Sequence, residues 1–339
     1  MQTNVRTAPD RAAITLRPGQ VDVLERPVPQ PQDGEVLVAV ACVSVCGTDA
    51  HIWAGDYPSA PPPLVQGHEI AGWVDGRLVA VDPARACGRC HACRVGRSNA
   101  CVSSSVLGVH ADGGLREHIV VPSGRIHPVD GLPPATAALI EPASIALQAV
   151  ARSRAERGAH ALVLGCGPIG LLAIGALAER GVRVAGVDRS GARARRAERF
   201  GASAMWVADA DDPRRRAEIL DWADGEGPSV VIEATGAPAA LATAIDLVCS
   251  AGTVVAVGIS TAEARLPMSV LPYKELDLLG SRNSMDRFPE AAAFIARNRG
   301  LAEELITHRF PLERTQEAFA LVHAGDAGAG KVVIDVVPS

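Results

Sequence analysis

The stretch Ala161-Leu-Val-Leu-Gly165-Cys-Gly167-Pro-Ile-Gly170 joins an apolar run to a G-x-G-x-x-G pattern. The run has the length of a buried strand, and the apolar residues after the glycines predict a helix. Glycines in such a turn let the backbone approach a pyrophosphate at the helix N-terminus, where free N–H groups and the helix dipole favour negative charge. A glycine-rich turn that binds no ligand is the alternative. The residues expected to contact a dinucleotide are Gly165, Gly167, Pro168, Ile169 and Gly170.

The next predicted strand, Val182–Val187, is followed directly by Asp188, 23 residues after Gly165. A carboxylate at this position accepts hydrogen bonds from the adenosine ribose hydroxyls and repels a 2′-phosphate. The sequence therefore favours NAD over NADP. Arg189 and Arg193 leave NADP as the alternative, because a guanidinium beside the ribose binds a phosphate well. We place Arg193 at the cofactor.

Strands and helices alternate through this part of the chain, which predicts a parallel, doubly wound α/β sheet. The first third is rich in strands and turns instead, and amphipathic helices with a final strand follow Gly280. We predict a catalytic domain over residues 1–150, a nucleotide-binding domain over 151–285, and a return to the first domain over 286–339. The predicted strands of the alternating region are Ala161–Leu164, Val182–Val187, Val230–Ile232 and Thr253–Val257, separated by helical segments such as Leu171–Glu179 and Ala239–Cys249.

The composition is that of a soluble globular protein with about two domains. The 339 residues are 48% hydrophobic, and the net charge of −5 provides no basic surface for nucleic acid. The uncharged run Ala161–Ala178 is long enough to span a membrane, but its spaced glycines and Pro168 favour a strand, a turn and a helix. The chain starts without an export signal, so we expect a cytoplasmic protein. Only two lysines occur, which we ascribe to codon bias.

Four of the eight cysteines lie within fifteen residues, at Cys87, Cys90, Cys93 and Cys101. Four thiolates at this spacing can close around one tetrahedral zinc ion and fill every ligand position. Two disulfides are the alternative, but they require an oxidising compartment. The segment 87–101 is therefore predicted to be a structural zinc lobe.

A second group of metal-binding residue types precedes the lobe. Cys46 opens Cys-Gly-Thr-Asp-Ala-His51, and Gly67-His68-Glu69 follows. A thiolate, an imidazole and a carboxylate with an open fourth position are typical of a catalytic zinc site. Taken singly, His68 is as easily a hydrogen-bonded loop histidine and Cys46 a small buried residue.

The order of these motifs resembles the zinc-containing medium-chain alcohol dehydrogenases over essentially the whole chain. The stretches Glu141-Pro-Ala-Ser-Ile-Ala-Leu-Gln148 and Gly280-Ser-Arg-Asn-Ser284 are similar to the polyol and sugar-acid branch, which includes sorbitol, L-idonate, L-gulonate and L-galactonate 5-dehydrogenases. The resemblance implies a mostly-β GroES-like catalytic domain, a Rossmann domain, two zinc ions per chain and a homodimer or homotetramer. One departure is a short Trp-Val-Asp75-Gly76-Arg connection, which predicts a tight hairpin.

The resemblance also implies roles for individual residues. Cys46 and His68 would bind the catalytic zinc, with Glu69 or Glu141 as the third ligand or beside it. Thr48 would take the proton of the substrate hydroxyl and pass it through the cofactor ribose to His51, while Asp49 orients a ligand. Trp53, His110 and Arg282 are candidates for the substrate pocket, although Trp53 is equally suited to packing and Arg282 to a structural ion pair or a cofactor contact.

These observations predict a zinc-dependent dehydrogenase that transfers a hydride from a secondary hydroxyl of a polyol or sugar acid to NAD. An L-threonine 3-dehydrogenase is the first alternative, because the Cys46–His51 motif is equally close to that enzyme. A non-catalytic NAD-binding protein is the second alternative, but such a protein is expected to have lost a ligand or a relay residue.

Overall fold

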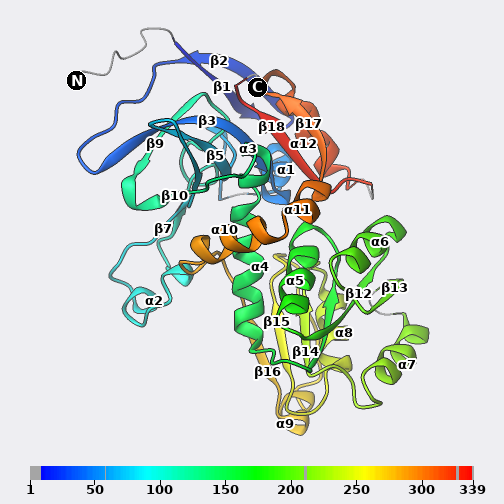
Figure 1. Ribbon diagram of the computed structural model, residues 1–339. Coiled ribbons are helices and arrows are strands. Elements are labelled where there is room, and N and C mark those ends of the chain that lie inside the picture. Colours follow the sequence, from blue (N-terminus) through cyan, green and yellow to red (C-terminus); the bar gives the residue numbers. More distant parts are fainter. Residues whose placement is uncertain (1–8, 58, 210–211, 326–327, 338–339) are drawn as a thin grey trace. The chain divides into compact units, whose positions relative to one another are not determined.

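The computed structural model describes residues 9–57, 59–209, 212–325 and 328–337. The chain divides into two compact units, one formed by the chain up to Glu141 together with the chain from Phe288 onward, the other by Pro142–Arg287. The first division falls inside helix α4 (Ile140–Ser153) instead of after residue 150, and the second lies just before helix α10 (Phe288–Arg297). Figure 1 shows the elements of each unit.

The second unit contains a six-stranded sheet within its described residues, and every strand pair in it is parallel. The strand order is β13-β12-β11-β14-β15-β16. The chain therefore adds β12 and β13 on one side of β11, and then crosses back to add β14, β15 and β16 on the other side. The doubly wound fold predicted from the sequence is confirmed. The strands are β11 (His160–Leu164), β12 (Arg183–Asp188), β13 (Ala204–Val207), β14 (Val230–Glu233), β15 (Thr253–Ala256) and β16 (Asp277–Gly280).

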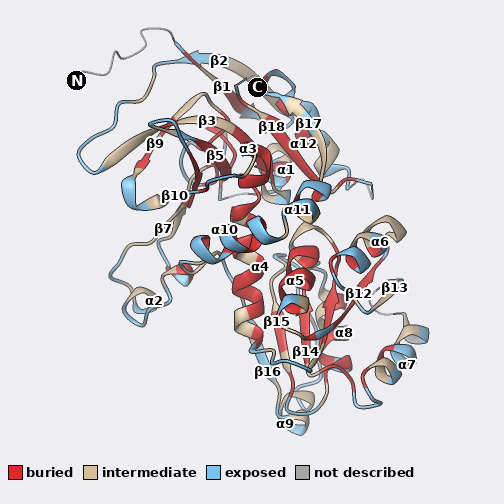
Figure 2. Cartoon of the chain, viewed as in Figure 1, coloured by how far each residue is buried: buried red, intermediate tan, exposed pale blue. Residues whose placement is uncertain are grey.

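The central strands of this sheet are buried on both faces, which explains their nearly continuous apolar sequences. Ala161, Leu162, Val163 and Leu164 are all buried in β11, and β14 is buried throughout (Figure 2). The edge strand β13 is only half-buried, and its sequence carries no clear strand signal. The helices of this unit are α5 (Pro168–Glu179), α6 (Gly191–Arg199), α7 (Pro213–Trp222), α8 (Pro238–Leu247) and α9 (Val270–Lys274).

The first unit is mostly β, as the resemblance implied. Its described residues form a seven-stranded sheet in the order β10-β6-β5-β3-β18-β17, with β9 also paired to β3, next to sheets of three and two strands. Strand β18, from the end of the chain, lies between β3 and β17 and so completes the sheet. The strands are β1 (Asp10–Arg17), β2 (Gln20–Arg26), β3 (Glu35–Val45), β4 (Leu64–Val65), β5 (Glu69–Val74), β6 (Arg77–Val81), β7 (Ala84–Arg85), β8 (Ser105–Val106), β9 (His118–Pro122), β10 (Ile126–Pro128), β17 (Ile306–Pro311) and β18 (Lys331–Asp335).

Short helices connect the strands of this unit. Helix α1 follows β3 directly and packs against α12, near the end of the chain. The core between the strands is aliphatic, with Phe319 of α12 as one of its few aromatic members. The helices are α1 (Gly47–Ala54), α2 (His91–Arg94), α3 (Pro134–Ala137), α10, α11 (Arg299–Leu305) and α12 (Thr315–His323).

The short connection between β5 and β6 forms the predicted tight hairpin. Val74 pairs with Arg77, and the two residues between them, Asp75 and Gly76, have φ of 48° and 76°. Positive φ at both central positions is the geometry of a type I′ turn, whose twist matches that of the strands. This connection is shorter than the loop that the family usually has here. The tight turn leaves the pairing of β5 with β6 intact, and β5 begins at the candidate metal ligand Glu69.

One helix of the described residues, Pro134–Ser153, is long and apolar enough to cross a membrane by length and composition alone. Of its most apolar window, 78% is buried inside the protein, as expected for a core helix. The uncharged run Ala161–Ala178 divides into strand β11, the glycine turn and helix α5.

Candidate active site

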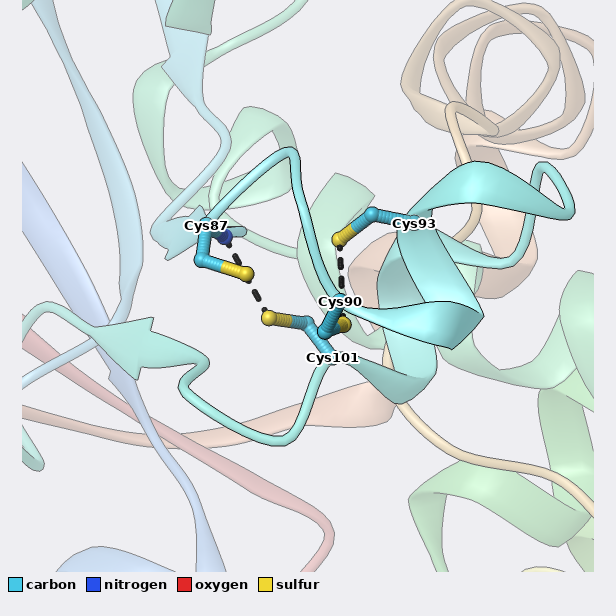
Figure 3. A group of neighbouring side chains, drawn as sticks. All are labelled: Cys87, Cys90, Cys93 and Cys101. Carbon is cyan, nitrogen blue, oxygen red and sulfur yellow. Dashed lines mark hydrogen bonds between the residues drawn. The ribbon is translucent and has the colours of Figure 1, made fainter.

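The four lobe cysteines converge on one point (Figure 3), and their sulfur atoms lie within 4.8 Å of one another. Cys90 precedes helix α2, and its Sγ lies 3.5 Å from Sγ of Cys93. The backbone N–H of Cys87 donates to Sγ of Cys101 at 3.2 Å. All eight cysteines belong to the described residues and all are free, so the disulfide alternative is not realised.

The lobe is well suited to thiolate ligands. Backbone N–H groups of Cys93 and Val102 lower the pKa of Cys90 to about 6, because they stabilise the anion, whereas burial raises the pKa of Cys93 to about 11. Four soft thiolates at this separation match the preference of a closed, tetrahedral zinc centre. The lobe is a structural zinc site with four cysteine ligands and no position left for a substrate.

A second donor set brings together Cys46, His68 and Glu69, whose ligand atoms also lie within 4.8 Å of one another. Cys46 is the residue before helix α1, and Glu69 begins strand β5 directly after His68. His68 and Glu69 are buried, whereas Cys46 is half-buried. One thiolate, one imidazole and one carboxylate fit zinc and leave a position open, as in catalytic sites. This set is the candidate catalytic zinc site.

Asp49 fixes the two segments that carry these ligands. It is fully buried, and its carboxylate accepts the N–H of Cys46 at 2.9 Å and the N–H of Gly67 at 3.1 Å. Burial alone would raise the pKa of Asp49, but the charge of His68 and these hydrogen bonds lower it. Nδ1 of His68 lies 3.6 Å from Oδ1 of Asp49, and this carboxylate raises the pKa of His68 well above its usual value despite burial. Asp49 therefore orients the site as an ionised group.

Lys331 is a neighbour of the site that sequence reasoning missed. Its ammonium donates to Oε1 of Glu69 at 2.6 Å and to the carbonyl of Val45 at 3.0 Å, and only 3% of the residue is exposed. Burial would lower the pKa of Lys331, but the charges of Glu69 and Cys46 raise it. The scarcity of lysine in the chain is the only sequence signal for this residue, and codon bias does not account for its buried position.

Glu141 lies beside this group at the start of helix α4, outside the close set of three donors. Burial raises the pKa of its carboxyl to about 8, and the charge of Glu69 acts in the same direction. His68 and Lys331 oppose this shift. Without a metal ion, burial therefore favours the neutral acid form of Glu141.

The predicted proton-transfer residues lie on helix α1, which begins directly after Cys46. Thr48 is half-buried in the first turn, two residues after Cys46. His51 is exposed in the last turn, with its Nδ1 3.8 Å from Oδ2 of Asp56. Trp53 packs at the edge of the core, and its ring contacts the edge of His323 with centroids 5.9 Å apart.

The other two substrate candidates lie apart from this helix in the sequence. His110 is exposed, and its Nδ1 accepts the backbone N–H of Val106 at 3.2 Å in a local turn. Arg282 is exposed in the second unit, two residues after strand β16. The geometry of the first unit therefore brings Cys46, His68 and Glu69 together, with Thr48 on the helix that follows Cys46, and holds His110 in its own turn.

The glycine turn borders a cleft of about 630 Å³ at the carboxyl ends of β11, β12 and β14. A Cβ on Gly170 would lie 1.9 Å from the carbonyl oxygen of Gly165, so the helix can approach the strand only if this residue is glycine. Gly165 has φ of 91°. A Cβ on Gly167 would meet no atom within 4 Å, so this position faces open space at the start of α5. Pro168 and Ile169 begin the helix. The turn therefore has the features of a dinucleotide cradle.

Asp188 lies at the end of β12 and lines the same cleft. Its two carboxylate oxygens each accept one backbone N–H, from Cys166 and from Ser190, at 2.8 Å. Nη1 of Arg193 lies 3.9 Å from Oδ2 of Asp188. The cleft thus presents a fixed carboxylate with a guanidinium beside it.

Sequence reasoning missed a second wall of the cleft, formed by Ala234, Thr235 and Ala237 after strand β14. Oε1 of Glu233 holds this loop by accepting the N–H of Thr235 at 2.6 Å and the N–H of Gly236 at 2.9 Å. Because β14 is the strand beside β11 where the chain reverses direction, its carboxyl end is where ligands bind in such sheets. That topological rule was the available signal.

Comparison with protein families gives two matches that together cover more than half of the chain. Residues 32–131 match the alcohol dehydrogenase GroES-like domain, and residues 168–297 match the zinc-binding dehydrogenase family. The first match contains both metal sites, whereas the second contains most of the dinucleotide cleft.

Known proteins of similar sequence align over nearly the full length. The chain is 36% identical to the L-galactonate-5-dehydrogenase of Escherichia coli K12 over 320 residues, 90% of this chain and 93% of that protein. It is 30% identical to the L-threonine 3-dehydrogenase of Bacillus subtilis, over 91% of this chain and 93% of that one. The structure of an alcohol dehydrogenase from Escherichia coli CFT073 complexed with NADH is 31% identical and superposes with a TM-score of 0.89, covering 97% of this chain and all of that one.

Proposed function

The chain belongs to the zinc-type medium-chain alcohol dehydrogenases, which act on CH–OH groups with NAD(P), and from that premise we propose that it oxidises a secondary hydroxyl of a sugar acid with NAD. The observation that carries the substrate class is the 36% identity to an L-galactonate-5-dehydrogenase over 90% of the chain. A polyol is a further substrate of the same chemistry, because the reacting group is the same secondary alcohol.

Cys46, His68 and Glu69 would hold the catalytic zinc, since their donor atoms already converge. When bound, zinc lowers the pKa of an alcohol and NAD accepts a hydride. Thr48 would accept the hydroxyl proton from its half-buried position in the first turn of α1. His51 would release that proton to solvent from the exposed last turn of α1.

Asp188 supports NAD as the acceptor. Both of its oxygens are fixed by backbone N–H groups, so its charge is held at the end of β12, where it repels a 2′-phosphate. Arg193, which lies beside Asp188, is the residue that would favour NADP. The ratio of kcat/KM with NAD to kcat/KM with NADP therefore tests this proposal directly.

The screen that tests the proposal measures NADH formation over aldonates, hexitols and L-threonine. We expect the highest kcat/KM with an aldonate. Oxidation of L-threonine alone would replace this proposal with the second candidate, which the 30% identity to an L-threonine 3-dehydrogenase supports. Failure of all three substrate classes would refute both substrate assignments and leave the family intact.

We propose that Arg282 binds the substrate carboxylate, because a guanidinium pairs bidentately with a carboxylate. Arg282→Ala should then raise KM for an aldonate far more than KM for the corresponding neutral polyol. An equal effect on both substrates would contradict this role.

We also propose a cytoplasmic location and a homodimer or homotetramer. None of the eight cysteines, all of which lie in the described residues, forms a disulfide, and this suits a reducing compartment. The oligomer rests on the family resemblance alone, and size-exclusion chromatography with light scattering tests it.

A further inference from the structure

A third cluster of metal-binding residue types lies on the surface of the first unit, and its donor residues belong to neither zinc site. It consists of His51 and Asp56, at the end of helix α1, and His323, at the end of helix α12. We name it the outer histidine cluster. Its three donor atoms lie within 4.8 Å of one another, the same limit that the two zinc sites satisfy.

The backbone places these three residues with little freedom. Asp56 donates its N–H to the carbonyl of His51 at 2.9 Å, and Gly55 ends the helix in the left-handed region with φ of 87°. Helix α12 packs against α1 (Figure 1), and the rings of His51 and His323 stand edge to face with centroids 6.1 Å apart. The two helix ends are therefore held together by packing that does not depend on a ligand.

The side chains keep the freedom that coordination requires. The side chains of His51 and Asp56 are each 60% exposed, and Nδ1 of His51 is 3.8 Å from Oδ2 of Asp56. Donors on one zinc ion, with bonds of about 2.0–2.2 Å, lie about 3–3.5 Å apart, so small rotations of exposed side chains suffice. Two imidazoles and one carboxylate suit Ni²⁺, Cu²⁺ and Zn²⁺ rather than Mg²⁺ or Ca²⁺.

We propose that the outer histidine cluster binds one divalent transition-metal ion, in addition to the two zinc ions of the family. The ion would occupy an imidazole nitrogen of His51 and thereby remove this residue from proton exchange with solvent. Excess transition metal would therefore slow the dehydrogenase reversibly. This inhibitory consequence rests on the proposed function of His51, whereas the binding itself does not.

Binding is tested with Ni²⁺ on the holoenzyme. Calorimetric titration should give one Ni²⁺ per chain, and elemental analysis afterwards should still find two zinc ions, which excludes exchange at the thiolate sites. Bound Ni²⁺ should also quench the fluorescence of Trp53, whose ring is in contact with His323. The Trp53→Phe variant should lose this quenching, which shows how much of it comes from Trp53.

His323→Ala and Asp56→Asn remove one donor each. Both residues are exposed, so the fold should be retained. Loss of a direct ligand should weaken Ni²⁺ binding by at least the roughly 10- to 100-fold that loss of an outer-shell partner costs. Asp224→Asn is the matched control, because Oδ2 of Asp224 also lies 3.8 Å from a histidine Nδ1, that of His160, but this pair belongs to no set of three donors among the described residues.

Equal Ni²⁺ affinity in wild type, H323A and D224N would overturn the site, as would the absence of a third metal ion. Relief of Ni²⁺ inhibition in H323A would support both the site and the role of His51. If no substrate is oxidised, calorimetry and fluorescence still decide the metal site, so its failure and that of the proposed function remain distinguishable.

Discussion

The ammonium of Lys331 lies 2.6 Å from Oε1 of Glu69, and both side chains are buried beside the candidate catalytic zinc site. The two residues are 262 positions apart in the chain. Strand β18 delivers the lysine next to β3, and β5, whose first residue is the glutamate, pairs with the other edge of β3. The return of the chain to the first unit thus completes the surroundings of a metal ligand.

Lys331→Met is expected to lower the stability of the zinc-free protein substantially. It leaves the Glu69 carboxylate buried without its cation, which costs about 3–5 kcal/mol when one partner of a buried ion pair is removed. The double variant K331M/E69Q should recover part of that loss. Urea-induced unfolding of the three proteins measures both effects.

Lys274→Met is the matched control, because Lys274 is the only other lysine. Its ammonium donates to three carbonyls at the end of helix α8, those of Ile245, Asp246 and Val248, and it is only half-buried. Its hydrogen bonds among the described residues go to carbonyls and not to a carboxylate, so the loss should be about 1–3 kcal/mol and zinc binding should be unchanged. Equal losses for the two lysine variants would argue against a special role of the Lys331–Glu69 pair.

Cys90→Ser and Cys46→Ser should each lower the zinc content from two ions to one, with opposite consequences. The first removes a ligand of the closed lobe, so thermal stability should fall because metal binding contributes to folding there. The second should abolish turnover and leave the fold intact. Elemental analysis, thermal unfolding and the NADH assay distinguish the two, with Cys249→Ser as the control thiol outside both sites.

Gly170→Ala and Gly167→Ala test the two functions of the glycine turn. The first places a Cβ 1.9 Å from the carbonyl oxygen of Gly165, so the strand and helix must separate and stability should fall. The second meets no protein atom within 4 Å, so the fold should be unchanged while NADH binding weakens. Thermal unfolding and NADH titration give the comparison, and tight NADH binding by G167A would place the cofactor elsewhere.

Asp188→Ala should shift cofactor preference towards NADP. The substitution removes a carboxylate that would bond the ribose and leaves Arg193 to attract a phosphate. Hydrogen bonds to a charged group contribute about 1.5–3 kcal/mol, which corresponds to a roughly 10- to 100-fold change in the NAD to NADP ratio of kcat/KM. Asp209→Ala, in the same cleft but exposed, should leave the ratio nearly unchanged.

Glu141→Gln should stabilise the zinc-free protein only at higher pH. Burial raises the pKa of Glu141 from 4.5 to about 8 in the folded state. Between these values the folded protein binds a proton that the unfolded chain has released, so wild-type stability falls as pH rises through this window. The variant has no carboxyl to ionise here and so does not lose stability in this way. The difference in free energy of unfolding between variant and wild type should be absent near pH 4.5 and largest above pH 8. A constant difference across the range, or the same trend in the exposed control Glu25→Gln, would contradict this cause.

The doubly wound sheet and the zinc lobe could be predicted from the sequence because their signals are local. The strand–glycine–helix pattern at Gly165–Gly170 and the spacing of Cys87–Cys101 each lie within a single short segment. Backbone conformation and short-range ligand spacing are fixed there by neighbours in the chain. The half-buried edge strand β13 escaped notice because an edge carries less of the apolar pattern that marks a buried strand.

Tertiary structure alone decided which distant residues meet. Asp49 reaches the loop before β5, Glu233 shapes the second wall of the cleft, Lys331 neutralises Glu69, and His323 stands beside His51. Nothing in the periodicity of one segment specifies its partner in another, because strand order and helix packing set those distances. The sequence by itself therefore determined the family and the candidate donor residues. The tertiary structure set their neighbours, the pKa values of the buried groups around them, and the outer histidine cluster at the end of α1.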